Sequence, residues 1–284
     1  MRASREAWRG PWPTPAIRST TRSAARAPPP WCSSTGGPGT TRFWKHQLDA
    51  FPGMRVIAID LPGNGRSSRR TDAAYTMELF ADAVHEVLTA ERVPSAFLVG
   101  HSMGFSVVEV FAAKYPQLCA GIASVDGAHF EVSSDPAGQA QWRQETEAMA
   151  AGMTTEKARE DFLAMLFLAD SPALLKDEVL AASRTVPLEI GRAMIAGVAA
   201  DLKYWLPKKV DLPCLAVYSP AYQLPPSYPS DFARTFPRVE FHQIGDVSHF
   251  FMLEVPYQLN QLLADFVARH RPPLIPPSQT DARD

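Results

Sequence analysis

The chain has 284 residues, which is enough for one large domain with a sizeable hydrophobic core. Its 28 lysine and arginine residues are balanced by 30 acidic ones, a net charge of −2, which gives no electrostatic support for nucleic acid or an anionic membrane as the main partner. The most apolar stretch, Phe162 to Ala169, is far shorter than the ~20 residues of a membrane span. The three cysteines are too far apart for a metal knuckle and too few for a disulfide framework. These features predict a cytoplasmic protein with no metal site and no membrane span.

The two ends of the chain differ in composition from its middle. Residues 1–30 are rich in arginine and proline and show no apolar period, so we assign no element to them and expect disorder. Residues 272–284 have the composition of a disordered tail. Between these ends we predict one core in two parts, residues 31–127 and 211–271, separated by an insertion at 128–210.

Short apolar runs alternate with helical apolar patterns along the core. Predicted strands cover residues 54–60, 96–100, 122–125, 215–218 and 239–244. Helical patterns follow most of these runs. This alternation predicts an α/β fold in which a mostly parallel sheet is flanked by helices on both faces.

The insertion at residues 128–210 has no convincing strand and is rich in alanine, leucine, methionine and glutamate. It begins directly after Asp126 and Gly127, at a predicted strand end. We therefore expect a helical cap over that edge of the sheet. Its methionine and aromatic side chains could line an apolar pocket or form the cap's own small core.

One short motif carries a candidate nucleophile. Residues Gly100 to Gly104 read Gly-His-Ser-Met-Gly and join a predicted strand directly to a predicted helix. A serine on such a tight turn stands clear of the sheet edge, and the start of the helix behind it favours developing negative charge. Ser102 is therefore the predicted nucleophile.

A serine nucleophile needs a base, and His249 is the predicted one. It lies in a loop after the last predicted strand and before the final helix, at the same edge of the sheet as Ser102. The order serine and then histidine is the one expected for this arrangement.

Four motifs together resemble the α/β-hydrolase superfamily, in particular its small lidded esterase-like members. They are Gly36–Gly39, Asp60–Ser67, Gly100–Gly104 and Ser248–Glu254, and the resemblance runs from Gly36 to about Arg269. It implies a serine nucleophile, a histidine that moves the proton, a carboxylate that orients the imidazole, and no cofactor. Carried over by position, it implies that the backbone amides of Met103 and Gly37 form the oxyanion hole, and that Asp60 is structural.

The carboxylate is where this chain departs from the commonest family pattern. The usual position follows the next-to-last strand, where residues 218–223 contain no acid. Asp126 ends the preceding strand, and some superfamily members are similar in placing the acid there. We predict that Asp126 is the triad acid, with Asp231 and Asp246 as alternatives, because a neutral imidazole needs an acceptor at its second nitrogen.

Three residues near the motifs are candidates for the substrate pocket. Phe105 follows the nucleophile motif, where many relatives carry a small residue, and it either packs against the sheet or narrows the pocket. His101 flanks Ser102 and could form a wall of the turn. Phe250 follows His249 directly.

The predicted function is hydrolysis of a carboxylic ester, or a related acyl bond, of a small apolar substrate. A perhydrolase or amidase reaction could use the same residues, and a catalytically silent ligand-binding receptor is the alternative from another class. Epoxide hydrolases and haloalkane dehalogenases resemble this scaffold but carry aspartate at the nucleophile position, where this chain has Ser102.

The segment before Gly36 poses a separate question. Relatives enter the oxyanion loop from an apolar central strand that ends in His-Gly, whereas this chain has Trp31–Thr35, a poor central strand by composition. A one-base shift of the reading frame would allow Val-Leu-Val-His-Gly at this place. We therefore hypothesise that the first 35 residues are read out of frame. If the chain is made as written, residues 31–34 must fill the central position or the sheet lacks that strand.

Overall fold

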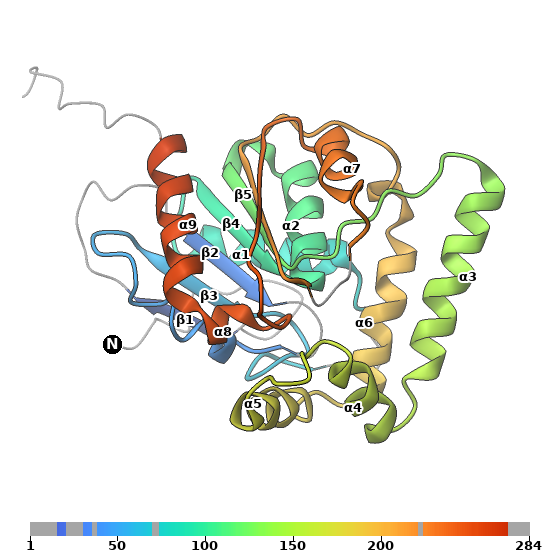
Figure 1. Ribbon diagram of the computed structural model, residues 1–284. Helices are drawn as coiled ribbons and strands as arrows, with labels where there is room; N and C mark the ends of the chain where they lie inside the picture. Colours follow the sequence, from blue (N-terminus) through green and yellow to red (C-terminus); the bar gives the residue numbers. More distant parts are fainter. Residues whose placement is uncertain (1–15, 21–30, 36–38, 70–73, 221–223, 272–284) are drawn as a thin grey trace, which may run out of the picture.

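The computed structural model describes residues 16–20, 31–35, 39–69, 74–220 and 224–271 (Figure 1). The predicted disordered tail at 272–284 lies outside these residues. The described residues form a seven-stranded sheet with the order β1-β3-β2-β4-β5-β6-β7, in which β1 is antiparallel to β3 and the other neighbours are parallel. The strands are β1 (Ala16–Thr20), β2 (Trp31–Thr35), β3 (Val56–Asp60), β4 (Ala96–His101), β5 (Cys119–Val125), β6 (Cys214–Tyr218) and β7 (Val239–Gln243).

Helices cover both faces of this sheet, which confirms the predicted fold class. Along β3, Ile57 and Ile59 join the core on the face of α1 and α2, whereas Val56 and Ala58 join the core on the face of α8 and α9 (Figure 1). A strand buried on both faces is apolar throughout, which is why these strands could be recognised in the sequence. The flanking helices are α1 (Met77–Ala90), α2 (Met103–Lys114), α7 (Tyr228–Thr235), α8 (Phe251–Glu254) and α9 (Pro256–His270), with short 3₁₀ turns η1 (Thr41–Trp44) and η2 (Pro116–Leu118).

The first two strands lie where the sequence has no apolar strand pattern. The first was not expected, and the second is one of the two outcomes expected of the chain as written. Residues 1–30 were assigned no element, yet Ala16–Thr20 pair with β3 as the edge strand of the sheet. Trp31–Thr35 fill the central position between β3 and β4 despite their composition. Strand pairing uses backbone N–H and C=O groups that every residue except proline carries, so it does not require an apolar pattern. The reading-frame hypothesis concerns the gene and stays a prediction.

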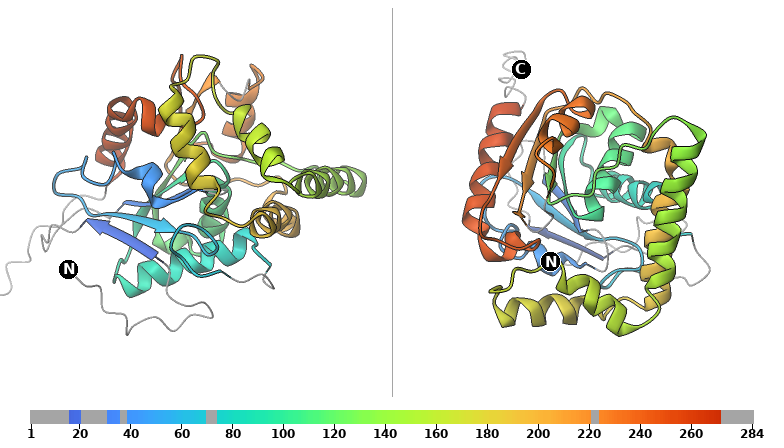
Figure 2. Two further views of the ribbon diagram at one scale, coloured as in Figure 1. Left: turned by 90° about the horizontal axis from the view of Figure 1, so that it is seen from below. Right: turned by 45° about the vertical axis from the view of Figure 1, so that its right-hand side comes forward.

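The cap lies between β5 and β6. Its helices α3 and α6 pack against each other, and all four cap helices gather on the side of the sheet where the parallel strands end (Figures 1 and 2). In the described ranges, no helix is both long and apolar enough to cross a membrane. The cap helices are α3 (Pro136–Gly152), α4 (Glu156–Ala164), α5 (Ala173–Ser183) and α6 (Leu188–Ala200), followed by the 3₁₀ turn η3 (Leu202–Tyr204).

Candidate active site

Ser102 occupies a strained turn between β4 and α2. Its backbone has φ 55° and ψ −132°, and a positive φ is uncommon for a residue with a side chain. Gly100 permits the turn, because a Cβ there would lie 2.4 Å from backbone atoms of Gly104 and Phe105. Glycine is therefore required where the first turn of α2 folds back over the end of β4.

The backbone of Ser102 is tied to two neighbouring segments. Its N–H donates to the carbonyl of Val125 at the end of β5 (3.2 Å), and its carbonyl accepts the N–H of Ala128 at the entry to the cap (2.9 Å). As the first residue of α2, Met103 has a backbone N–H with no intrahelical acceptor, at the positive end of the helix dipole. Gly37, the other predicted oxyanion donor, lies outside the described residues.

A buried imidazole–carboxylate pair lies beside this turn. Nδ1 of His249 is 3.0 Å from Oδ2 of Asp126, and the two side chains are 1% and 0% exposed. The ring centroids of His249 and His101 are 4.4 Å apart, which puts His249 next to the residue that precedes Ser102. Because a carboxylate only accepts hydrogen bonds, Nδ1 carries the proton in this pair and Nε2 carries the lone pair.

Asp126 receives two further hydrogen bonds from Ser219 at the end of β6. The Ser219 N–H donates to Oδ1 (2.7 Å) and its hydroxyl donates to Oδ2 (2.5 Å). Three donors therefore replace the water that this buried carboxylate has lost. Ser219 was not predicted from the sequence. The signal that could have identified it is its place directly after the strand that pairs with β5, where the usual acid is absent.

A tyrosine holds the turn that follows Asp126. Asp126 has φ 45°, and the hydroxyl of Tyr218 donates to the carbonyl of Gly127 (2.8 Å). Ser124 Oγ accepts the Gly127 N–H (3.2 Å). Burial raises the pKa of Tyr218 well above its usual value, so the phenol remains a donor.

The two alternative acids, Asp231 and Asp246, are not buried as Asp126 is. Asp231 is partly exposed on α7, where it bonds to Arg234 (2.5 Å) and Ser227 (2.9 Å). The hydrogen bond from Arg234 holds the pKa of Asp231 below its usual value. Asp246 lies at an exposed position of the loop after β7.

The cap reaches the loop that carries His249. The backbone N–H of His249 donates to the carbonyl of Leu166, just after α4 (3.0 Å). The rings of Phe167 and Phe250 lie 5.1 Å apart, beside the same loop. The position of the imidazole thus depends on the cap as well as on the core.

A second buried histidine–carboxylate pair, which was not predicted from the sequence either, anchors the entry to the cap. Nδ1 of His129 lies 3.0 Å from Oε1 of Glu109 on α2, and the two side chains are almost fully buried. One residue earlier, the carbonyl of Ala128 accepts a hydrogen bond from the hydroxyl of Ser106 (2.7 Å). These bonds fasten the segment after Asp126 to the helix that begins at Ser102.

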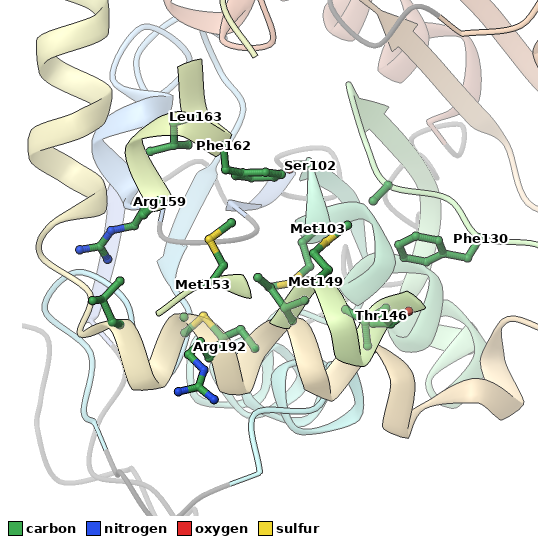
Figure 3. Close-up of a pocket in the computed structure, with 16 residues that line it drawn as sticks. Ser102, Met103, Phe130, Thr146, Met149, Met153, Arg159, Phe162, Leu163 and Arg192 are labelled. Carbon is green, nitrogen blue, oxygen red and sulfur yellow. The ribbon is translucent and has the colours of Figure 1, made fainter. Parts of the chain in front are cut away.

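An apolar cavity of about 310 Å³ opens at Ser102 beneath the cap. Met149, Met153 and Phe162 point into it, whereas the guanidinium groups of Arg159 and Arg192 are directed away (Figure 3). This volume is at the lower end of the range for small-molecule sites. The lining residues come from the turn after β4 (Ser102, Met103), from the entry to the cap (Ala128, Phe130), from α3 to α4 (Thr146, Met149, Met153, Arg159, Phe162, Leu163) and from α6 (Leu188, Gly191, Arg192, Met194, Ile195, Val198).

The three predicted pocket residues are not among those that line this cavity. Phe105 is fully buried against Phe232 and Phe236 of the core, because the first turn of α2 directs its side chain away from the cap. His101 faces the His249 loop, where its Nε2 bonds to the carbonyl of His249 (2.9 Å). Phe250 packs against Phe43 and Phe167, so it supports the same loop from behind.

Asp60 has the surroundings of a structural residue. Its carboxylate accepts the backbone N–H of Thr41 (2.6 Å) and of Arg66 (3.2 Å). A Cβ at Gly65 would collide with this carboxylate at 2.5 Å. Asp60 thus joins the loop after β2 to the loop after β3. Across the part of the chain that the structure describes, no group of three or more His, Cys, Asp or Glu side chains could hold a metal ion.

Comparison with known proteins agrees with this architecture. The sequence model of the alpha/beta hydrolase fold matches residues 35–188, more than half of the chain, so the chain belongs to the α/β-hydrolase family. It is 39% identical over 93 residues to epoxide hydrolase B of Mycobacterium tuberculosis, a match that covers 32% of this chain and 26% of that relative. The matched stretch is thus about a quarter of the relative's length.

Two solved esterases share the fold at low sequence identity. An esterase from Exiguobacterium antarcticum superposes with a TM-score of 0.73 at 15% identity, covering 89% of this chain and 95% of that one. A thermophilic esterase from Thermogutta terrifontis gives 0.70 at 22% identity, covering 91% and 94%. Together with the family match, these likenesses show that the chain has the α/β-hydrolase fold.

The burial of His101 predicts a pH dependence of stability. Burial, and then the neighbouring His249, hold the pKa of His101 well below its usual value of 6.5. Below pH 6.5 the unfolded chain therefore binds a proton at this residue that the folded protein does not, and stability falls as the pH falls. His101→Gln keeps an amide donor for the carbonyl of His249 but removes the titrating group. Denaturant unfolding between pH 5 and 8 should show a steeper acid loss for the wild type than for His101→Gln. Equal slopes would contradict this account.

Proposed function

We propose that this chain is a serine hydrolase that cleaves a carboxylic ester, or a related acyl bond, of a small apolar substrate through an acyl-enzyme on Ser102. The observation that carries the proposal is the buried bond between His249 and Asp126 beside the strained turn of Ser102. An imidazole held in this way has the tautomer needed to take a proton from a serine hydroxyl.

The proposed reaction begins when Nε2 of His249 takes the proton of the Ser102 hydroxyl and Oγ attacks the acyl carbon. The carbonyl electrons move onto oxygen, and the N–H of Met103 stabilises the oxyanion, with Gly37 as the second donor implied by the family resemblance. His249 then gives the proton to the leaving alcohol as the C–O bond breaks. A water molecule, deprotonated by the same imidazole, attacks the acyl-enzyme. The imidazolium then returns this proton to Oγ of Ser102 as the bond between Oγ and the acyl carbon breaks, which releases the acid and free Ser102.

In this proposal Asp126 is the acid that orients the imidazole, and Ser219 positions Asp126. The two bonds from Ser219 limit rotation of the carboxylate, so that its Oδ2 stays beside Nδ1 of His249. The apolar cavity supports an uncharged substrate, because burying an unpaired charge there would be costly.

The similarity to an epoxide hydrolase does not argue against ester hydrolysis by a serine nucleophile. Opening an epoxide by the route of the related enzymes needs a carboxylate nucleophile, and this chain has Ser102 at that position. Amide cleavage or perhydrolysis would use the same residues with another leaving group or nucleophile.

A fluorophosphonate probe tests the nucleophile directly. The wild type should be labelled at one serine, and Ser102→Ala should remain unlabelled while folded, because Oγ is the only atom removed. Wild-type protein should also hydrolyse p-nitrophenyl esters. Mass spectrometry of the labelled peptide identifies the site. A folded wild type that takes no label would instead favour a catalytically silent ligand-binding receptor.

The acid is tested by a pair of matched substitutions. Asp126→Asn should lower kcat on the order of 10⁴-fold, the loss seen when the triad aspartate of a serine protease becomes asparagine. Asparagine tolerates the positive φ at this position, so the fold should be kept. Asp231→Asn should lower kcat by less than about twofold. Steady-state kinetics with one ester measure kcat for both variants. A larger loss of kcat in Asp231→Asn than in Asp126→Asn would identify Asp231 as the acid.

The role of Ser219 can be separated from its packing by exchanging two side chains of equal shape. Ser219→Thr keeps the hydroxyl, whereas Ser219→Val replaces it with a methyl group. A hydrogen bond to a charged group is worth about 1.5–3 kcal/mol, so Ser219→Val should lower kcat by about 10- to 100-fold relative to Ser219→Thr, with little change in KM. Equal kcat values in the two variants would show that the hydroxyl does not matter.

A further inference from the structure

Gly191 stands in the wall of the cavity with empty space in front of it. Six residues of α6 line the cavity, and four of them, Leu188, Gly191, Ile195 and Val198, are spaced by three, four and three residues and so share one face of the helix. A Cβ added at Gly191 would meet no heavy atom of the described residues within 4 Å. A side chain at this position would therefore extend into the cavity.

Gly197, on the same helix, is a position where close packing requires glycine. A Cβ at Gly197 would lie 2.0 Å from the carbonyl oxygen of Tyr75, so only glycine lets α6 dock on the segment before α1. Glycine inside a helix costs about 1 kcal/mol relative to alanine. At Gly197 this close approach explains the glycine, whereas at Gly191 no neighbouring atom does. Glycine at position 191 instead leaves this part of the cavity open.

We propose that Gly191 determines the size of the apolar group that the site accepts, and that the substrate is an ester carrying an aliphatic group longer than acetyl. This inference rests on the proposed ester hydrolysis. The lining residues of α6, from Leu188 to Val198, span about 15 Å at 1.5 Å per residue, which gives the cavity length as well as volume. Flexible methionines such as Met149 and Met153 can adapt to such a chain.

The test compares Gly191→Ala and Gly191→Leu with Gly152→Leu. Gly152 ends α3, also has no atom within 4 Å of an added Cβ, and is not among the residues that line the cavity. Two ester series are used: p-nitrophenyl acetate to octanoate, and ethyl to octyl acetate. One methylene group in an apolar pocket changes kcat/KM by about tenfold or more. Gly191→Leu should therefore lower the ratio of kcat/KM for the eight-carbon ester to that for the two-carbon ester at least tenfold in one series.

The series that responds tells whether the acyl or the alcohol group occupies the cavity. Gly191→Ala should give a smaller change and Gly152→Leu none. An unchanged ratio in both series for Gly191→Leu, or an equal loss for short and long esters, would overturn the inference.

Two further measurements separate this inference from the proposed function. Calorimetric binding of 1-octanol should weaken at least tenfold in Gly191→Leu and stay unchanged in Gly152→Leu, whether or not the protein hydrolyses esters. A wild type that binds octanol but cleaves no ester would contradict the proposed function and leave the role of Gly191 in the cavity standing. Thermal unfolding tests the open space itself: Gly191→Ala should raise Tm and Gly197→Ala should lower it. A lowered Tm in Gly191→Ala would mean that the site is packed and the inference is wrong.

Discussion

The buried carboxylate of Asp126 imposes the strongest constraint on this edge of the sheet. Removing a charge from water costs several kcal/mol unless well-placed donors replace the solvent. Here the donors come from His249 after β7 and from Ser219 after β6. Three strand ends must therefore meet in the correct register, and the parallel pairing of Val125 with Val217 sets the distance between two of them.

The same constraint explains why the turns at this edge are strained. Ser102 and Asp126 both have positive φ, and each follows directly after a buried parallel strand. Such strain persists only where surrounding contacts hold it in place. Gly100 provides the room for the first turn, and Tyr218 with Ser124 holds the second. The chemistry that we propose for Ser102 and His249 thus relies on an arrangement that the sheet imposes.

The cap takes part in the geometry of the site as well as covering it. The carbonyl of Leu166 accepts the N–H of His249, so a change in the cap can move the imidazole. At the entry to the cap, the pair of His129 and Glu109 fixes the segment that follows Asp126 to α2. In the site that we propose, the core contributes the reacting groups, and the cap contributes most of the cavity wall, including Gly191.

The sequence by itself determined the α/β class, the parallel strands from β3 to β7, and the motif that places Ser102 on a strand–helix turn. These features leave a local record, because burial on both faces makes a strand apolar throughout and a tight turn requires glycine. The prediction of Asp126 rather than Asp231 as the acid also came from the sequence, since residues 218–223 contain no acid. Only the tertiary structure brought Asp126 to His249, 123 residues away, and Ser219 to Asp126, 93 residues away.

Tertiary structure alone also decided which side chains line the cavity. Phe105, His101 and Phe250 were candidates for this pocket, with packing against the sheet as the alternative for Phe105 and a wall of the turn as the alternative for His101. None of them lines the cavity, and α3, α4 and α6 of the cap supply most of the wall. The strands β1 and β2 are likewise defined by backbone pairing, β1 with β3 and β2 with both β3 and β4. In each case the deciding contact joins residues far apart in the chain, so no local period or motif records it.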